Sequence, residues 1–276
     1  MPNRDQVRPV GVAGEFFPLN KDRLESKISF LLENAPQLSF PRPIRAMIVP
    51  HAAYTYSGGV AARAFRQIMH HHYELIVVIA LSHSEKYAYT SLYPGKAFQT
   101  PLGNIALDVN FIDQLVTVNS DILLSVTGFA PSEHTIEVHL PFLMWMAHRA
   151  KLVPMMMGMQ ESDVIQSVYT ALSEALKNKN FLIIASSDLS HYHPDEKART
   201  LDQVVMENVE HFAPDQLYVD IKKRKCEMCS YGPTIVAMKV AKALGATEGR
   251  LLLYRNSGDI NGDLDKVVGY LSAVFY

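Results

Sequence analysis

Leu75–Leu81 (LIVVIAL) is a run of apolar residues that ends at the tripeptide Ser82-His83-Ser84. A short run with no polar face is typical of a strand buried on both sides, as in a parallel sheet covered by helices. Similar runs predict further buried strands at residues 44–49, 152–157, 181–185 and 251–254. The last apolar run, Val267–Phe275, predicts a strand that returns to the sheet.

Stretches whose apolar residues recur near helical spacing lie between these runs. They predict helices at residues 21–33, 59–69, 136–147, 162–176, 198–209 and 233–244. Strands that alternate with helices predict an α/β fold with a mostly parallel central sheet flanked by helices. No tandem repeat, low-complexity tract or long linker interrupts the sequence, so we expect residues 1–276 to form a single domain.

The composition argues against several classes of partner. Charged residues make up 20% of the chain and the formal net charge is -2, without a basic block, so we expect neither nucleic acid nor an anionic membrane as a partner. No apolar run reaches the roughly 18 residues of a membrane-spanning helix. The N-terminal residues lack the apolar core of a signal peptide. With only two cysteines in a chain of 276 residues, disulfides are not expected to be the main source of stability, and we expect a reducing, cytoplasmic setting.

Imidazole and carboxylate side chains follow three of the predicted strands. His51 follows the strand at 44–49, His83 follows Leu75–Leu81, and Asp188 and His191 follow the strand at 181–185. Ligands of open α/β sheets bind beyond the carboxyl ends of the strands, so these side chains are expected to meet. Imidazole with carboxylate suits Zn, Fe, Cu or Ni rather than Mg or Ca. The alternative is that each histidine separately caps a turn or binds a backbone carbonyl.

The two cysteines form the sequence Cys226-Glu227-Met228-Cys229, and Pro233 opens a predicted helix four residues later. A thiol just before a helix N-terminus has a lowered pKa, and its thiolate serves as a nucleophile, a redox centre or a soft metal ligand. A single C-x-x-C lacks the second cysteine pair of a Cys₄ zinc site. The pair therefore leaves open metal binding by one thiol and disulfide cycling between both.

Residues 133–141 (EHTIEVHLP) combine two glutamates and two histidines without forming the HExxH motif of zinc proteases. On a helix His134 and Glu137 share a face. The stretch is interpreted either as a polar helix start with a capping carboxylate or as a segment with a residue that donates a proton or binds substrate. Pro141 predicts that any helix here is kinked or begins again after Leu140.

Several stretches, in the same order along the chain from about residue 8 to the end, together resemble the Memo family. They are residues 13–17 (AGEFF), 50–58 (PHAAYTYSG), 82–83 (SH), 133–141 (EHTIEVHLP), 187–191 (SDLSH) and 268–270 (VGY). The resemblance implies a fold similar to the class III extradiol ring-cleaving dioxygenases, which use non-haem Fe(II). It also implies a metal site formed by His51, His83 and Cys229, with Asp188 and His191 lining the same cavity.

Two positions depart from the family pattern. Ala53 stands where the family usually has glycine, so either a positive φ there would be strained or the local turn differs. Val12 replaces a histidine that precedes the Ala-Gly pair in some relatives, so no N-terminal metal ligand is expected. Bacterial relatives, called AmmeMemoRadiSam system protein B, commonly accompany a radical-SAM protein and an AMMECR1-like protein, which implies a functional association.

Three functional hypotheses follow. The first is a metal-dependent redox protein, a non-haem iron oxygenase that uses Fe(II), or Cu or Zn in place of iron. In this hypothesis His191 or His134 would act as acid or base. Asp188 would orient a histidine or bind substrate. The second is a binding or adaptor protein that reuses an enzyme's fold to hold a small-molecule or peptide ligand. The third is thiol chemistry, in which Cys226 and Cys229 cycle as a disulfide.

Overall fold

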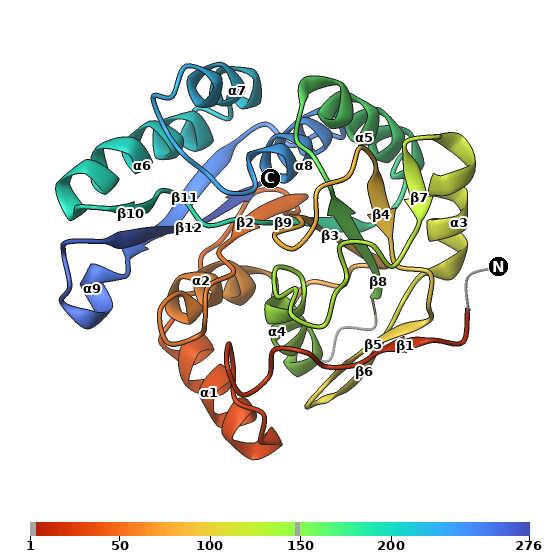
Figure 1. Ribbon diagram of the computed structural model, residues 1–276, viewed down its shortest axis with the longest axis horizontal. Coiled ribbons are helices and arrows are strands. Elements are labelled where there is room, and N and C mark those ends of the chain that lie inside the picture. Colours follow the sequence, from red (N-terminus) through yellow and green to blue (C-terminus); the bar gives the residue numbers. More distant parts are fainter. Residues whose placement is uncertain (1–3, 147–149) are drawn as a thin grey trace.

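The computed structural model describes residues 4–146 and 150–276 (Figure 1). Its large sheet has the strand order β10-β12-β2-β9-β3-β8-β4-β7, with β11 paired to β12. The strands at its centre run parallel; they are β2 (Ala46–Val49), β9 (Phe181–Ser186), β3 (Leu75–Leu81) and β8 (Lys151–Met157). The predicted α/β fold with a mostly parallel central sheet is therefore confirmed.

The flanks of this sheet are antiparallel where they join its centre. β12 (Val267–Phe275) runs against β2, and β4 (Thr90–Leu92) runs against β8. β10 (His191–His193) and β11 (Gly249–Asn256) both pair antiparallel with β12, and β7 (Ile122–Leu124) pairs parallel with β4. The expectation that residues 251–254 form a buried parallel strand was wrong, because β11 is half-exposed and forms a hairpin with β12.

A small second sheet has the order β1-β5-β6. β1 (Val7–Arg8) pairs parallel with β5 (Ala97–Thr100), and β5 pairs antiparallel with β6 (Gly103–Ala106). These strands were not predicted from the sequence, and neither were β4, β7 and β10. Strands of two to four residues contain too few alternations to stand out from their surroundings.

Helices cover both sides of the large sheet, with α1, α2 and α4 on one side and α5 to α8 on the other (Figure 1). Those that match predictions are α1 (Lys21–Glu33), α2 (Gly58–Ile68), α5 (Ser162–Ala175), α6 (Asp195–Glu210) and α8 (Tyr231–Ala243). Those not predicted are α3 (Val109–Val118), α7 (Pro214–Lys222) and α9 (Gly258–Asn261).

The helix predicted at residues 136–147 is divided in two. A 3₁₀ turn, η1, spans Glu137–His139, and α4 spans Leu140–Trp145 with Pro141 in its first turn. Proline lacks the backbone N–H that an interior turn needs but fits a first turn, so the restart after the turn follows from Pro141. The last predicted residue, Ala147, lies outside the described residues.

Candidate metal centre

Three side chains predicted as metal ligands meet at the carboxyl edge of the parallel strands. His51 follows β2, His83 follows β3, and Cys229 lies two residues before α8. Their potential donor atoms lie within 4.8 Å of one another, and Cys229 Sγ is 3.4 Å from His51 Nε2. An ion bound at about 2.0–2.3 Å to each ligand places tetrahedral ligands about 3.3–3.8 Å apart. The donor set therefore fits one ion after a small inward movement.

The three side chains differ in exposure. His51 is buried, with 2% of its surface exposed, Cys229 is half-buried and His83 is exposed. The candidate centre is thus anchored in the core at His51 and open to solvent at His83. An ion held here would be accessible from solvent on the His83 side, as catalytic metal sites require.

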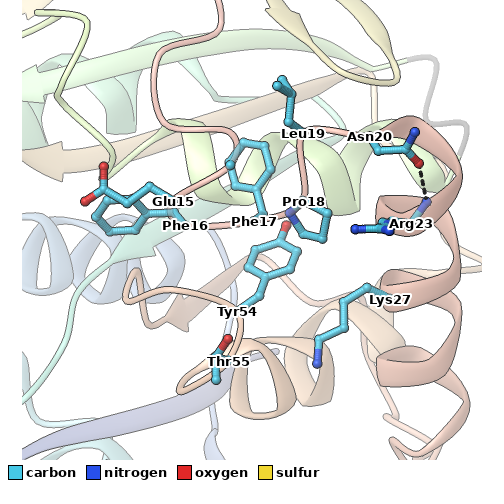
Figure 2. Close-up of a pocket in the computed structure, with 11 residues that line it drawn as sticks. Glu15, Phe16, Phe17, Pro18, Leu19, Asn20, Arg23, Lys27, Tyr54 and Thr55 are labelled. Carbon is cyan, nitrogen blue, oxygen red and sulfur yellow. Dashed lines mark hydrogen bonds between the residues drawn. The ribbon is translucent and has the colours of Figure 1, made fainter.

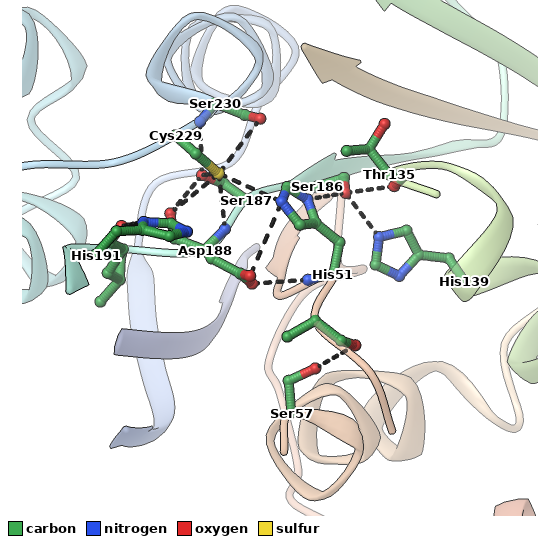
Figure 3. A network of polar contacts seen from close by, with 12 residues as sticks. His51, Ser57, Thr135, His139, Ser186, Ser187, Asp188, His191, Cys229 and Ser230 are labelled. Carbon is green, nitrogen blue, oxygen red and sulfur yellow. Dashed lines mark hydrogen bonds and ion pairs between the residues drawn. The ribbon is translucent and has the colours of Figure 1, made fainter. Parts of the chain in front are cut away.

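Ser186, the last residue of β9, fixes the tautomer of His51 (Figure 3). Its hydroxyl lies 2.5 Å from the carbonyl oxygen of Thr135, which can only accept, so the single hydroxyl proton is donated there. The same oxygen lies 2.8 Å from His51 Nδ1 and 2.9 Å from His139 Nε2. Both ring nitrogens must therefore donate to it. Neutral His51 carries its proton on Nδ1 and presents the lone pair of Nε2 to Cys229.

His139 is the buried neutral partner in this arrangement. Burial, together with smaller contributions from the neighbouring His51 and His134, lowers the pKa of His139 to about 3. At neutral pH the ring is uncharged, and its Nε2–H is directed at Ser186. From the sequence, His139 was recognised only as part of the motif at residues 133–141, and no role was predicted for Ser186. Their partners lie 47 to 135 residues away in the chain, which sequence spacing does not indicate.

Asp188 holds both His51 and Cys229 in place through its side chain and its backbone. Its Oδ1 accepts a hydrogen bond of 2.8 Å from the backbone N–H of His51, and its Oδ2 lies 3.9 Å from His51 Nε2. Its own backbone N–H donates to Cys229 Sγ at 3.2 Å, while the Cys229 N–H donates to the Asp188 carbonyl. These contacts, and the 3.4 Å between Sγ and the Asp188 carbonyl oxygen, fix the position of the sulfur beside His51.

Gln160 secures the turn that carries the cysteine. Its Nε2 donates to the Cys229 carbonyl at 2.9 Å, and its Oε1 accepts from the N–H of Gly232 at 2.8 Å. A Cβ atom at Gly232 would lie 2.6 Å from Gln160 Cβ, so glycine permits this close approach. Gln160 was not identified from the sequence.

Glu133 positions the loop that carries His83. Its Oε2 accepts hydrogen bonds from the N–H groups of His83 and Ser84 at 2.8 and 3.3 Å, and its Oε1 accepts from the Thr135 hydroxyl at 2.9 Å. Burial raises the pKa of this carboxyl, but the hydrogen bonds outweigh burial and the net shift is downward. Glu133 therefore acts as an ionised anchor of the His83 loop, and it does not cap a helix: neither η1 nor α4 has a side-chain hydrogen bond at its N-cap.

His134 lies beside the candidate ligands. Its ring stacks on Phe16 at 4.3 Å between centroids and on His83 at 5.5 Å. Burial lowers the pKa of His134 to about 4, and the neighbouring His51 contributes, so the ring is neutral at pH 7. His83, Glu133 and His134 form a second group of potential donors within 4.8 Å. The oxygens of Glu133 are already engaged by backbone and hydroxyl donors, so this group is the poorer candidate.

His191 and Cys226 stand apart from the candidate ligands. His191 Nδ1 donates to the Leu189 carbonyl at 2.8 Å, which leaves Nε2 as the acceptor in the neutral ring; its side chain lies beyond Asp188 in the network (Figure 3). Cys226 is buried, and burial together with nearby carboxylates raises the pKa of its thiol to about 12. Among the described residues, Cys226 belongs to neither group of potential metal donors. The buried, protonated thiol disfavours cycling with Cys229.

The two positions that depart from the family pattern are accommodated without strain. Ala53 is absent from the described non-glycine residues with positive φ, which are Asn178, Tyr192, Phe212 and Arg224. The turn after His51 therefore does not require glycine. Val12 is buried, and its N–H donates to Glu137 at 2.9 Å.

Within residues 4–146 and 150–276, no helix combines the length and apolar character that crossing a bilayer requires.

Comparison with known proteins gives consistent matches over nearly the whole chain. A family model described as Memo-like protein matches residues 8–274. A MEMO1 family protein of Methanobrevibacter smithii is 34% identical over 282 residues, which cover 98% of this chain and 99% of the relative. A MEMO1 family protein of Aquifex aeolicus is 34% identical over 274 residues, with the same shares covered.

A solved structure is similar in fold. The crystal structure of an uncharacterized protein from Escherichia coli K12 matches 85% of this chain and 100% of its own, with a TM-score of 0.55 and 14% sequence identity. At this identity the likeness concerns the fold alone.

Proposed function

This chain belongs to the Memo family, and from that premise we propose that it is a metal-dependent redox protein of the non-haem iron, dioxygenase-like kind. His51, His83 and Cys229 would hold the ion. The observation that carries the proposal is the convergence of these donor atoms within 4.8 Å at the carboxyl edge of the sheet. The Nδ1–H tautomer of His51, which leaves Nε2 free, adds independent support.

The chemistry of the donor set favours particular metals. Two neutral imidazoles and one thiolate carry a single negative charge, the same charge as two histidines and one carboxylate. Fe(II) fits this set, and the soft thiolate also suits copper or zinc. When bound, a non-haem iron supplies open coordination positions for an oxidant and a chelating substrate.

The surrounding side chains would orient the ligands and handle protons. Asp188 fixes the backbone of His51 and donates its N–H to the Cys229 sulfur. His191 offers an acceptor nitrogen, Nε2, because Nδ1 is committed to the Leu189 carbonyl. His134, neutral at pH 7 and stacked on the ring of His83, is the second candidate for proton transfer.

Metal analysis of protein purified under anaerobic conditions tests this proposal. The wild type is compared with the double variant His51→Ala/His83→Ala, and folding is checked by circular dichroism. We expect near-stoichiometric iron or copper in the wild type and its loss in the variant. A wild type that neither contains metal nor binds added Fe(II), Cu(I) or Zn(II) would contradict the proposal and favour an adaptor role, with the same site serving as a ligand pocket.

A further inference from the structure

Helix α1 carries one row of polar side chains along the surface of the molecule. Arg23, Lys27 and Asn34 are four and seven residues apart, a spacing that keeps them on one face of a helix. Figure 2 shows Arg23 and Lys27 extending from this face toward Tyr54 and Thr55, the loop that precedes α2. This row forms one wall of a depression in the surface.

Two concavities adjoin along this row. The first has a volume of about 730 Å³ and lies between α1 and residues 14–20. The second has a volume of about 340 Å³ and continues between α1, α2 and β11. Both are lined by Lys27, Tyr54 and Thr55, so they form one continuous depression, which we call the α1 groove.

The α1 groove is positively charged, although the chain as a whole carries a net charge of -2. Among its lining residues Glu15 is the one carboxylate. The cations are Arg23, Lys27, Arg63 and Arg255. In the part of the chain that the structure describes, none of these four forms an ion pair within 4.0 Å. Their charge is therefore available to an anionic partner.

Apolar side chains accompany these charges. Leu19, Phe30, Tyr56 and Ile260 line the groove and are exposed by 60%, 60%, 38% and 47%. They are four of the eleven exposed large hydrophobic residues among those described, gathered along one surface feature. Apolar side chains that alternate with unpaired cations are poorly suited to bulk water but suited to a partner that carries both acidic and apolar groups.

We propose that the α1 groove binds an extended acidic peptide segment of a partner protein, with its carboxylates on Arg23 and Lys27 and an apolar side chain beside Phe30 and Ile260. This proposal does not depend on metal binding at His51, His83 and Cys229. The occupant is identified by charge complementarity with the unpaired cations and by the apolar walls. The phosphates of a nucleic acid would pair with these cations but would leave the apolar side chains exposed to water.

The dimensions of the groove specify the peptide further. Arg23 and Lys27 are one helical turn apart, so their side chains leave the helix about 6 Å from each other. Carboxylates two residues apart on an extended chain are about 7 Å from each other and lie on the same side. From Arg23 to Asn34 the helix rises by about 16 Å, which an extended peptide spans in about five residues. The expected motif is therefore acidic-x-acidic followed by an apolar residue.

An array of labelled hexapeptides tests this inference with the full-length protein. It holds acetylated Glu-Ala-Glu-Ala-Leu-Leu and its Asp variants, charge-reversed peptides with Lys in place of Glu, and peptides with Ser in place of Leu. Binding is measured by fluorescence anisotropy at low and physiological ionic strength. We expect the acidic peptides with leucines to bind best, and their affinity to fall as salt rises.

Two charge-reversed proteins locate the site. Arg23→Glu/Lys27→Glu is expected to weaken binding by at least about tenfold. The control Lys197→Glu/Lys223→Glu changes the net charge equally at exposed positions outside the groove and is expected to bind like the wild type. Equal binding by both variants, no preference for acidic peptides, or tighter binding of a twelve-nucleotide oligo(dT) through Arg23 and Lys27 would overturn the proposal. An unchanged circular dichroism spectrum and thermal unfolding midpoint would show that both variants are folded.

Discussion

The Ser186 hydroxyl lies 2.8 Å from Nδ1 of His51 and gives its own proton to the Thr135 carbonyl, so it can serve His51 only as an acceptor. This relationship determines which nitrogen of His51 faces Cys229. Partners that fix the tautomer of a metal-binding histidine affect affinity although they never touch the ion. The Ser186 hydroxyl thus connects the end of β9 with the loop after β2, through His51, and with residues 133–141, through Thr135.

Ser186→Ala is expected to weaken metal binding by about 10- to 100-fold, because His51 then samples both tautomers. In the metal-free protein, ¹⁵N NMR of the imidazole rings should show a proton on Nδ1 of His51 in the wild type and a mixture of tautomers in the variant. Ser272→Ala is a matched control, since it removes a buried hydroxyl for which the described structure gives no hydrogen-bond partner. A His51 protonated on Nε2 in the wild type would refute the assignment.

Acid should destabilise the metal-free protein through His139. Its pKa is lowered by burial from 6.5 to about 3 in the folded state, so the unfolded chain binds more protons between these values. Stability is therefore fully present above about pH 6.5 and falls as the pH drops, by up to about 1.4 kcal/mol per pH unit for this group.

Urea unfolding in the presence of a chelator, repeated between pH 4 and 7.5, measures this slope. His139→Gln keeps an N–H donor for Ser186 but cannot be protonated, so its stability should depend less steeply on pH than that of the wild type. His134, whose pKa is also lowered by burial, supplies part of the remaining slope. Identical slopes for the wild type and His139→Gln would show that His139 is not the buried neutral group assigned here.

Glu133→Gln should loosen the loop that carries His83. The carboxylate accepts hydrogen bonds at both oxygens, whereas an amide would turn an N–H group toward the donors of His83 or Thr135. We expect a loss of stability of about 1–3 kcal/mol together with weaker metal binding. Hydrogen exchange of the His83 and Ser84 amides should accelerate.

Glu137→Gln provides the comparison for that experiment. Glu137 is buried, pairs with Arg8 at 2.5 Å and accepts from the backbone N–H groups of Gly11 and Val12. Its replacement leaves the buried guanidinium without its counter-ion, at a cost of about 3–5 kcal/mol. It should leave the metal affinity of the folded protein unchanged. Equal losses of affinity in the two glutamate variants would mean that general destabilisation, and not the His83 loop, explains the effect of Glu133→Gln.

The fold was predictable where the sequence signal is local. The run at Leu75–Leu81 coincides with β3, and this strand lies between two parallel neighbours, so every residue but the last is buried. Length and lack of a polar face are sufficient to identify such a strand. β11 was misassigned as a buried parallel strand because apolar letters alone do not distinguish it from a half-exposed hairpin strand.

The candidate metal centre was predictable in part for the same reason. His51 and His83 directly follow predicted strands, and strand ends meet at one edge of a parallel sheet. Cys229 was predicted as the third metal ligand through the family resemblance. In the structure its Sγ lies 3.4 Å from His51 Nε2. The role of Ser186 depends on contacts with the distant residues Thr135 and His139, which no local pattern contains.

Cobalt(II) titration under anaerobic conditions tests the central claim most directly, because a thiolate bound to Co(II) gives an intense near-ultraviolet charge-transfer band. We expect one equivalent of Co(II) to produce this band in the wild type and in Cys226→Ser, whose thiol is buried away from the ligands. Cys229→Ser should lack the band, and His51→Ala should bind Co(II) more weakly. A band that persists in Cys229→Ser, or that disappears in Cys226→Ser, would contradict a centre formed by His51, His83 and Cys229.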